Sequence, residues 1–151
     1  MKAILQRVSH AQVDVDNKTV GKIGKGFLIL LGVESGDDEV EADVLASKIS
    51  GLRIFTDETD KMNLSLADVN GSALVISNFT LCADCSHGRR PSFIGAARPE
   101  IANPLYEYFC QKLLDNGVGV VEKGIFGADM QVSLLNDGPV TIDINSKDLK
   151  R

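Results

Sequence analysis

Asn136-Asp137-Gly138-Pro139-Val140-Thr141-Ile142-Asp143 is the stretch of this chain that says most about its fold. It connects two apolar segments, 130–135 and 139–144, that have the composition of short strands. A cis peptide costs roughly 2–3 kcal/mol less before proline than before other residues, and glycine accepts backbone angles that a Cβ forbids. Two interpretations follow: an ordinary hairpin turn, or a rigid corner without side chains whose carbonyl groups point outward into a binding site.

The chain upstream of this stretch has the pattern of several strands. Residues 2–15 alternate apolar and polar side chains, and the segment 19–23 returns as a second strand after a short turn. The continuous apolar run from Phe27 to Val33 predicts a strand that is buried on both faces. Further short strands are expected at 73–76 and around 118–122.

Two segments have the periodicity of helices. The first begins near Asp37, with Ser35 or Asp37 as its N-cap, and its apolar face is Val40, Val44, Leu45, Ile49 and Leu52. The second carries Leu105, Tyr108, Phe109, Lys112 and Leu113 at helical spacing. Because proline is tolerated in the first turn of a helix, Pro104 predicts a start near Asn103, and Asn116-Gly117 predicts the end.

These elements predict one domain, residues 1–151, of the α/β class and the α+β type, with a largely antiparallel sheet and two main helices packed on it. A chain of this length buries about 68–70% of its unfolded surface, which is enough for a single core. No apolar run reaches the ~18 residues that a membrane-spanning helix needs, so we expect no membrane partner.

The charge balance limits the nucleic acids that the chain can bind. Its net charge is −5, which argues against broad phosphate-driven binding and against a DNA partner, but leaves room for a local basic patch. Arg89 and Arg90, with Arg98 nearby, form the densest one, and they either pair with surface carboxylates or contact an RNA end. An odd number of cysteines, 3, and the lack of a signal-peptide pattern predict a cytoplasmic protein.

The sequence offers few side chains for hydrolytic chemistry. His10 lies in a predicted strand and His87 in a polar loop, and no nucleophile elbow, phosphate-binding glycine loop or His-Glu-x-x-His motif is present. The Cys82-Ala83-Asp84-Cys85 motif is weak, because a structural zinc takes four ligands and a redox pair opens a helix. We expect no metal and no cofactor.

The segment Ser77-Asn78-Phe79-Thr80-Leu81 follows the 73–76 strand and offers two hydroxyl groups at its end. Such hydroxyls commonly make local hydrogen bonds, and the segment can equally form a corner beside a reacting group. With Asn136, Gly138, Pro139 and Thr141, it resembles the paired motifs of the D-aminoacyl-tRNA deacylase family, Ser-Gln-x-x-(Thr)-Leu and Asn-x-Gly-Pro-x-Thr. The departure is Asn78, where the family usually has glutamine.

The likeness covers nearly the whole chain, including the stretches 1–8, 88–93 and 126–132. It implies a sheet that curls toward a barrel, a homodimer, and hydrolysis of the ester between a D-amino acid, or glycine, and the 3′-terminal adenosine of tRNA, which is a proofreading step in translation. The D-aminoacyl-tRNA 3′ end is then the partner, with Arg89 and Arg90 as possible RNA contacts.

The resemblance also assigns roles to single residues. The catalytic segment is Ser77, Asn78, Phe79 and Thr80, whose backbone donors would stabilise the oxyanion of the ester. Gly138 and Pro139, joined by a cis peptide, would reach into the pocket of the partner subunit and exclude the side chain of an L residue. The supporting residues are Asn136, Thr141 and Met130.

Two other functions stay open at this point. The scaffold can hydrolyse other small esters, or it can be a non-catalytic module that binds the tRNA end, which the missing base and Asn78 favour. A related branch of the family acts on L-alanine mischarged on tRNA, and Ser77 at the head of the first motif favours the D-selective branch instead.

Overall fold

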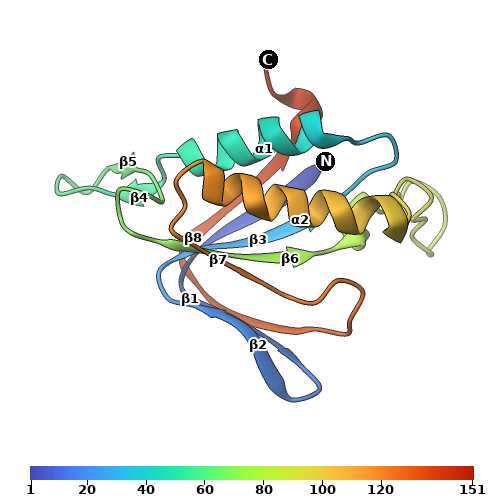
Figure 1. Ribbon diagram of the computed structural model, residues 1–151, viewed down its shortest axis with the longest axis horizontal. Coiled ribbons are helices and arrows are strands. Elements are labelled where there is room, and N and C mark those ends of the chain that lie inside the picture. The colour runs from blue at the N-terminus through green and yellow to red at the C-terminus, as the bar shows by residue number, and fades with distance from the viewer.

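A curved sheet carries two helices on one face (Figure 1). The computed structural model describes the whole chain, residues 1–151. The strands of the main sheet are β1 (Lys2–Val15), β2 (Lys18–Ile23), β3 (Gly26–Gly32), β6 (Ser72–Ser77), β7 (Val120–Lys123) and β8 (Gln131–Asn145). The remaining elements are α1 (Glu39–Gly51), the small hairpin of β4 (Phe55–Thr56) and β5 (Met62–Leu64), α2 (Pro99–Asp115), and the 3-10 helices η1 (Phe79–Cys82) and η2 (Ser146–Asp148).

The sheet is mixed rather than largely antiparallel. Its strand order is β2-β1-β3-β6-β7, with β8 also paired to β1. β1 pairs antiparallel with β2, β3 and β8, whereas β3 pairs parallel with β6, and β6 parallel with β7. The parallel pairs arise because α1 and α2 are crossover connections, which return the chain to the same end of the sheet before each next strand.

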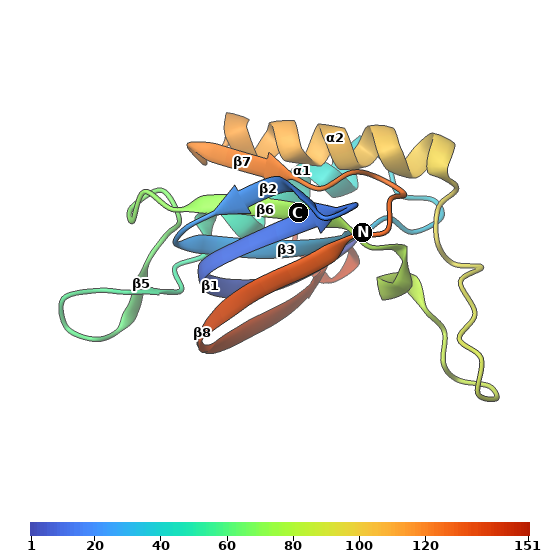
Figure 2. The same cartoon turned by 90° about the horizontal axis from the view of Figure 1, so that it is seen from below.

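The sheet curls until it nearly closes into a barrel, as the family resemblance implied (Figure 2). A Cβ on Gly21 of β2 would lie 2.7 Å from the carbonyl oxygen of Lys123 in β7, so these distant strands pack directly on each other. The interior of the curl is a separate apolar cluster of Val8, Ala11, Val13, Ile23, Leu28, Leu74 and Ile76.

The main core lies between the sheet and the helices and contains 24 buried residues. Phe27, Ile29 and Leu31 of β3 point into this core, whereas Leu28 joins the cluster inside the curl. β3 is therefore buried on both faces, as its continuous apolar run predicted.

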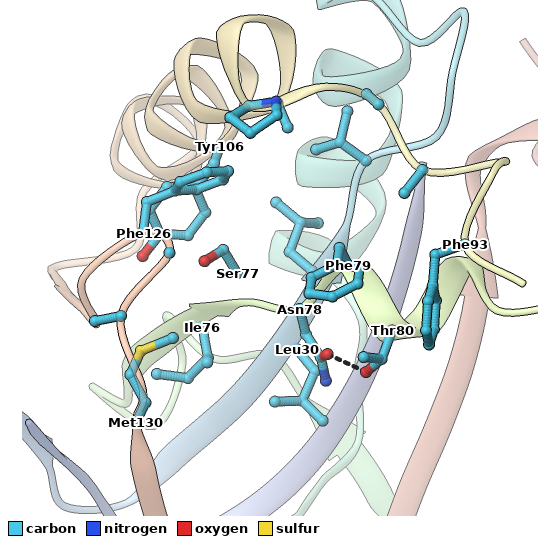
Figure 3. A pocket seen from close by; sticks show the side chains of 18 of the residues that line it. Leu30, Ile76, Ser77, Asn78, Phe79, Thr80, Phe93, Tyr106, Phe126 and Met130 are labelled. Carbon is cyan, nitrogen blue, oxygen red and sulfur yellow. Dashed lines mark hydrogen bonds between the residues drawn. The ribbon is translucent and has the colours of Figure 1, made fainter. Parts of the chain in front are cut away.

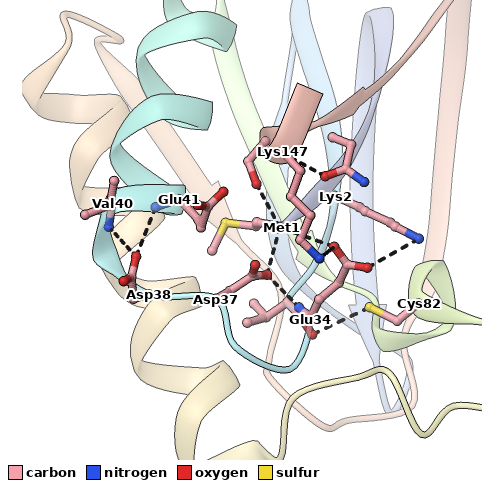
Figure 4. Close-up of polar contacts among 12 residues, drawn as sticks. Met1, Lys2, Glu34, Asp37, Asp38, Val40, Glu41, Cys82 and Lys147 are labelled. Carbon is pink, nitrogen blue, oxygen red and sulfur yellow. Dashed lines mark hydrogen bonds and ion pairs between the residues drawn. The ribbon is translucent and has the colours of Figure 1, made fainter. Parts of the chain in front are cut away.

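The N-cap of α1 is Asp38, not Ser35 or Asp37. The Asp38 carboxylate accepts a hydrogen bond from the amide of Val40 at 2.9 Å. Asp37 has a different partner: its carboxylate lies 2.8 Å from the amino group of Met1 and accepts the amide of Glu34 at 2.7 Å (Figure 4). The expected cap was wrong because a buried cation nearby binds Asp37.

α2 begins at Pro99, four residues before the predicted start at Asn103. Pro99 occupies the first helical position, which suits proline, and Pro104 lies inside the helix. Pro104 removes a single backbone hydrogen bond there, and the buried face with Tyr106 and Phe109 keeps the helix intact. No helix of the structure is long and apolar enough to cross a membrane.

β8 is one long strand, where the sequence predicted two. It pairs with β1 on both sides of the Gly-Pro stretch, from Lys2↔Asn145 to Asp14↔Gln131, so the hairpin interpretation is wrong. Between the pairs Gln6↔Thr141 and Val8↔Asn136, four residues of β8 face Arg7 alone. Residues 137–140 therefore form a bulged corner, and the peptide between Gly138 and Pro139 is cis.

Candidate active site

A pocket of about 820 Å³ lies at the C-terminal ends of β3 and β6 (Figure 3). Its walls are η1, the start of α2 and the segment 126–130, and 14 of its 20 lining residues are hydrophobic. Volume and composition are those of a small-molecule site, in which a few polar groups fix the orientation of the ligand.

The predicted catalytic segment forms one side of this pocket. Ser77 is the last residue of β6, Asn78 is the N-cap of η1, and Phe79 and Thr80 open that helix. The amide of Asn78 donates to the carbonyl oxygen of Leu31 at 2.8 Å and is therefore engaged. The amides of Phe79 and Thr80 have no partner within η1, because the first residues of a helix lack one. They are free to donate to a ligand.

The Thr80 hydroxyl donates to the side-chain carbonyl of Asn78, which is the hydrogen bond drawn in Figure 3. This contact gives Asn78 a local role that does not need the longer glutamine side chain. It also commits the proton of Thr80 to an amide oxygen, which is no base. A threonine nucleophile needs a base as the partner of its hydroxyl, and the partner here is an amide oxygen.

No imidazole and no thiol lines the pocket. His10 is exposed on β1, and His87 shares a hydrogen bond of 2.8 Å with Ser86. Cys82 is buried beside Val33, and Cys85 is exposed. Burial raises the pKa of the Cys82 thiol, so it stays protonated and acts as an apolar packing residue.

Sequence reasoning missed two polar side chains of the pocket. Asp129 is its only carboxylate, and Tyr106 donates its hydroxyl to the carbonyl oxygen of Val75 at 2.7 Å. Burial raises the pKa of Tyr106 far above its usual range, so the hydroxyl remains a neutral donor that holds the end of β6. Helical spacing alone favoured Tyr108 as the buried tyrosine, but Tyr106 is fully buried and Tyr108 only partly.

Met130 lines the pocket beside Ile76, as Figure 3 shows. A Cβ on Gly124 would lie only 2.6 Å from the Met130 sulfur, so the absence of a side chain at Gly124 makes room for it. Phe126 lies next to Tyr106, with the ring centroids 6.1 Å apart. The stretch 126–130 is therefore one apolar wall of the site.

The Gly138-Pro139 corner does not line the pocket of its own chain. The corner lies opposite Arg7 of β1, and Arg7 pairs with Phe27 near the start of β3. The pocket lies near the other end of β3, where Leu31 pairs with Ser77 of β6. Four residues along a strand correspond to ~13 Å, so corner and pocket lie at opposite ends of the sheet. Figure 2 shows the bend of β8 and the short helix η1 at opposite sides of the molecule.

Side chains of the same segment hold the corner in shape. The Asn136 side chain accepts the amide of Val140 at 2.9 Å and donates to the Thr141 hydroxyl at 3.1 Å. Gly138 has a φ of +139°, and a Cβ there would lie 2.9 Å from the Val140 side chain. Only glycine fits this position without strain.

Arg7 anchors the corner from the neighbouring strand. Its guanidinium donates to the carbonyl oxygen of Asp137 at 3.0 Å and to that of Ile54 at 2.8 Å. The Asp137 carboxylate lies 3.6 Å away and adds an ion pair. No local sequence pattern indicates this role, because the contact joins residues 130 positions apart.

Arg89 and Arg90 lie on an arm, residues 83–98, that projects from the body of the protein (Figure 2). Phe93, Ala96 and Ala97 of this arm line the pocket. Both residues are exposed, and neither forms an ion pair, whereas Arg98 lies 3.6 Å from Glu100. Of the two alternatives for this basic patch, pairing with a surface carboxylate holds for Arg98 but not for Arg89 and Arg90.

Fold and site together define a class of protein: a curled mixed sheet with an apolar pocket that has a short polar segment, Ser77 to Thr80, on one side. The family model described as D-Tyr-tRNA(Tyr) deacylase matches residues 4–145. The chain belongs to this family of D-aminoacyl-tRNA deacylases, as the two sequence motifs predicted.

Individual relatives agree with this assignment. The D-aminoacyl-tRNA deacylase of Pseudoalteromonas translucida is 57% identical over 144 residues, 95% of this chain and 99% of the relative. That of Geotalea daltonii is 60% identical over 141 residues, 93% of each chain. Among solved structures, a c-Myc DNA unwinding element binding protein matches with a TM-score of 0.91 at 37% identity, covering 96% of this chain and 98% of that one.

A probable eukaryotic D-amino acid tRNA deacylase matches with a TM-score of 0.79 at 18% identity, covering 95% of this chain and 98% of that one. At this identity the likeness concerns the fold alone.

Proposed function

We propose that this chain hydrolyses the ester between a D-amino acid, or glycine, and the 3′-terminal adenosine of tRNA. The observation that carries the proposal is the pocket at residues 77–80, in a chain 57–60% identical to D-aminoacyl-tRNA deacylases. Such an enzyme removes D residues before they enter translation, and we expect it to act in the cytoplasm.

The chemistry rests on main-chain donors. Water attacks the ester carbonyl, and the free amides of Phe79 and Thr80 stabilise the negative charge that develops on its oxygen. The bond between the carbonyl carbon and the ribose 3′-oxygen then breaks, and this oxygen takes up the proton that the water loses, which releases the amino acid and the 3′-hydroxyl of the tRNA. The family resemblance implies that the neighbouring 2′-hydroxyl of the substrate assists proton transfer, which suits a pocket without an imidazole.

Selection between D and L residues falls to the corner of a second subunit. Gly138 and Pro139 are exposed and lie far from the pocket of their own chain, so they are available to a neighbour. In a homodimer, their carbonyl groups would hold the α-amino group and leave no space for an L side chain. The long edge strand β8, with Leu135 half exposed, supplies an apolar surface for that dimer.

The direct test compares hydrolysis of D- and L-aminoacyl-tRNA carrying the same amino acid. We expect the D ester to be cleaved and the L ester to be spared. Equal rates would favour a hydrolase of other small esters on this scaffold. Tight binding of the tRNA end without turnover would favour a non-catalytic module.

A mixing experiment tests the exchange of corners between subunits. Gly138→Ala disables the corner through its Cβ contact, and Phe79→Pro disables the pocket because proline lacks the backbone N–H and is tolerated at the start of a helix. If the corner serves the partner, dimers formed from both variants contain one intact site. When equal amounts of the two variants exchange subunits at random, half of the dimers are mixed, and one of the two sites in each mixed dimer is intact. About a quarter of all sites are then restored. No restoration would mean that the corner acts within its own chain, or not at all.

A DNA partner is not part of this proposal. Although the name of one structural neighbour refers to a DNA element, the chain has a net charge of −5, and a binding mode based on many phosphate contacts requires a basic surface. The unpaired arginines of the arm suit a short RNA end instead.

A further inference from the structure

An exposed aromatic pair lies where the arm meets the pocket. The rings of Phe79 and Phe93 meet edge to face with their centroids 5.1 Å apart, and Figure 3 shows both rings near Thr80. Phe79 is 58% exposed and Phe93 38%, and the next residue, Ile94, is 91% exposed. Aromatic faces that stay open to solvent beside a ligand site are the surfaces on which unpaired bases stack.

The arm is held in a defined shape. Asp84 and Ser92 exchange two backbone hydrogen bonds, of 2.8 and 2.9 Å, so residues 85–91 form a closed tip. The Asp84 carboxylate also accepts the amide of Ser86 at 2.9 Å. Phe93 follows the pinned residue directly, and the aromatic pair is thereby fixed at the base of the arm.

The tip has the opposite charge to the rest of the molecule. Arg89 and Arg90 are exposed and unpaired on a chain with a net charge of −5. Two other basic side chains are paired, Arg98 with Glu100 and Lys123 with Glu107 at 2.7 Å, whereas Arg89 and Arg90 have no acidic partner. A polyanion that reaches the pocket along the arm is therefore attracted at this tip and repelled by most of the remaining surface.

We propose that the arm binds the single-stranded nucleotides immediately 5′ of the terminal adenosine. A base stacks on the Phe79–Phe93 pair, and Arg89 and Arg90 contact the adjoining phosphates. The inference rests on the proposed function, since it takes the aminoacylated adenosine to occupy the pocket. It gives the acidic protein a way to recognise an RNA end with only two phosphate contacts.

The test compares two substrates that differ only in the RNA. D-aminoacyl-adenosine fills the pocket alone, whereas D-aminoacyl-tRNA also reaches the arm. The double variant Arg89→Ala/Arg90→Ala should lose about tenfold in kcat/KM on the tRNA substrate and less than about twofold on the short one. Lys61→Ala, which removes an exposed positive charge on the β4–β5 hairpin, is the matched control and should change neither.

Salt dependence gives a second readout. Each phosphate contact to a single strand contributes about −0.7 to the slope of log affinity against log salt. The double variant should therefore flatten the slope of kcat/KM on the tRNA substrate by about 1.4. Equal losses on both substrates, or an unchanged slope, would overturn the role of the arginines.

Phe93→Ala tests the stacking surface, with Phe93→Tyr as the variant that keeps the ring. The alanine variant should lose about tenfold more on tRNA than on D-aminoacyl-adenosine, and tyrosine should restore the difference. A loss that is equal on both substrates would limit Phe93 to the pocket wall and refute the platform.

Failure of the proposed function has a different signature. If the wild-type protein cleaves neither substrate, the ester hydrolysis is refuted, and the arm is judged by binding alone. Fluorescence anisotropy with an uncharged oligonucleotide of the tRNA 3′ end should then still show weaker binding for the double variant. No difference in that titration would overturn the arm as well.

Discussion

Replacing Arg7 by methionine tests how firmly the Gly138-Pro139 corner must be held. The Arg7 side chain is only 10% exposed and donates to the carbonyl oxygens of Asp137 and Ile54 at 3.0 and 2.8 Å. Hydrogen bonds from a charged donor are each worth roughly 1.5–3 kcal/mol, and methionine keeps most of the apolar stem. We expect the free energy of unfolding to fall by about 3 kcal/mol.

The functional effect should exceed what lost stability explains. Without Arg7, residues 137–140 keep only the Asn136 contacts, and the corner moves relative to β1. If the corner excludes L residues, the ratio of kcat/KM for D- over L-aminoacyl-tRNA should fall by at least about tenfold, which corresponds to 1.4 kcal/mol. Urea denaturation gives the stability, and initial rates with both esters give the ratio.

The control is Arg7→Lys, which keeps a charge but cannot reach both carbonyl groups with a planar fork. Its stability and its D/L ratio should lie between those of the wild type and the methionine variant. A methionine variant that loses the expected stability yet keeps the wild-type D/L ratio would refute the link between the anchored corner and chiral selection.

Three further predictions concern single contacts. Asn78→Gln should change kcat/KM by less than about tenfold, because the Asn78–Thr80 contact already orders the segment, and a gain of several hundredfold would contradict that. Burial raises the pKa of the Cys110 thiol to about 12. An unfolded thiol ionises near ~8.5, so the unfolded chain binds fewer protons above that pH, and the free energy of unfolding should fall by up to ~1.4 kcal/mol per pH unit between about pH 9 and 12. Urea titrations on both sides of about pH 9 should show a shallower fall for Cys110→Ala, and an unaltered slope would speak against the thiol. Asp38→Ala should cost about 1 kcal/mol of stability and Ser35→Ala almost nothing, and the reverse order would place the cap elsewhere.

Local patterns predicted most of the elements but not how they pair. The run from Phe27 to Val33 predicted a doubly buried strand because every position is apolar, and burial on both faces requires just that. The parallel pairing of β3, β6 and β7 depends on where α1 and α2 cross the sheet, which periodicity does not encode. Likewise β8 continues through Gly138-Pro139, because pairing with β1 on both sides outweighs the local preference for a turn.

Sequence motifs predicted some residues of the candidate site, and the others follow only from the three-dimensional structure. The pocket segment 77–80 was identified through family motifs, and the structure brings Met130 to the same pocket. No sequence pattern indicated Tyr106 or Asp129 as pocket residues, because Tyr106 lies within a helix pattern and Asp129 within a loop. Arg7 contacts Asp137, 130 positions away, so its role follows only from the register between β1 and β8.

The proposed use of the amides at the start of η1 has a consequence for how the protein responds to mutation. Every amino acid except proline supplies the same N–H, so a conventional substitution scan passes over these two groups without a signal. Removing one of these amides while leaving every side chain in place requires chemical synthesis, in which a backbone ester replaces the amide at Phe79 or Thr80. On the proposed mechanism, sequence drift can therefore alter the lining of the cavity widely while its two amide donors persist.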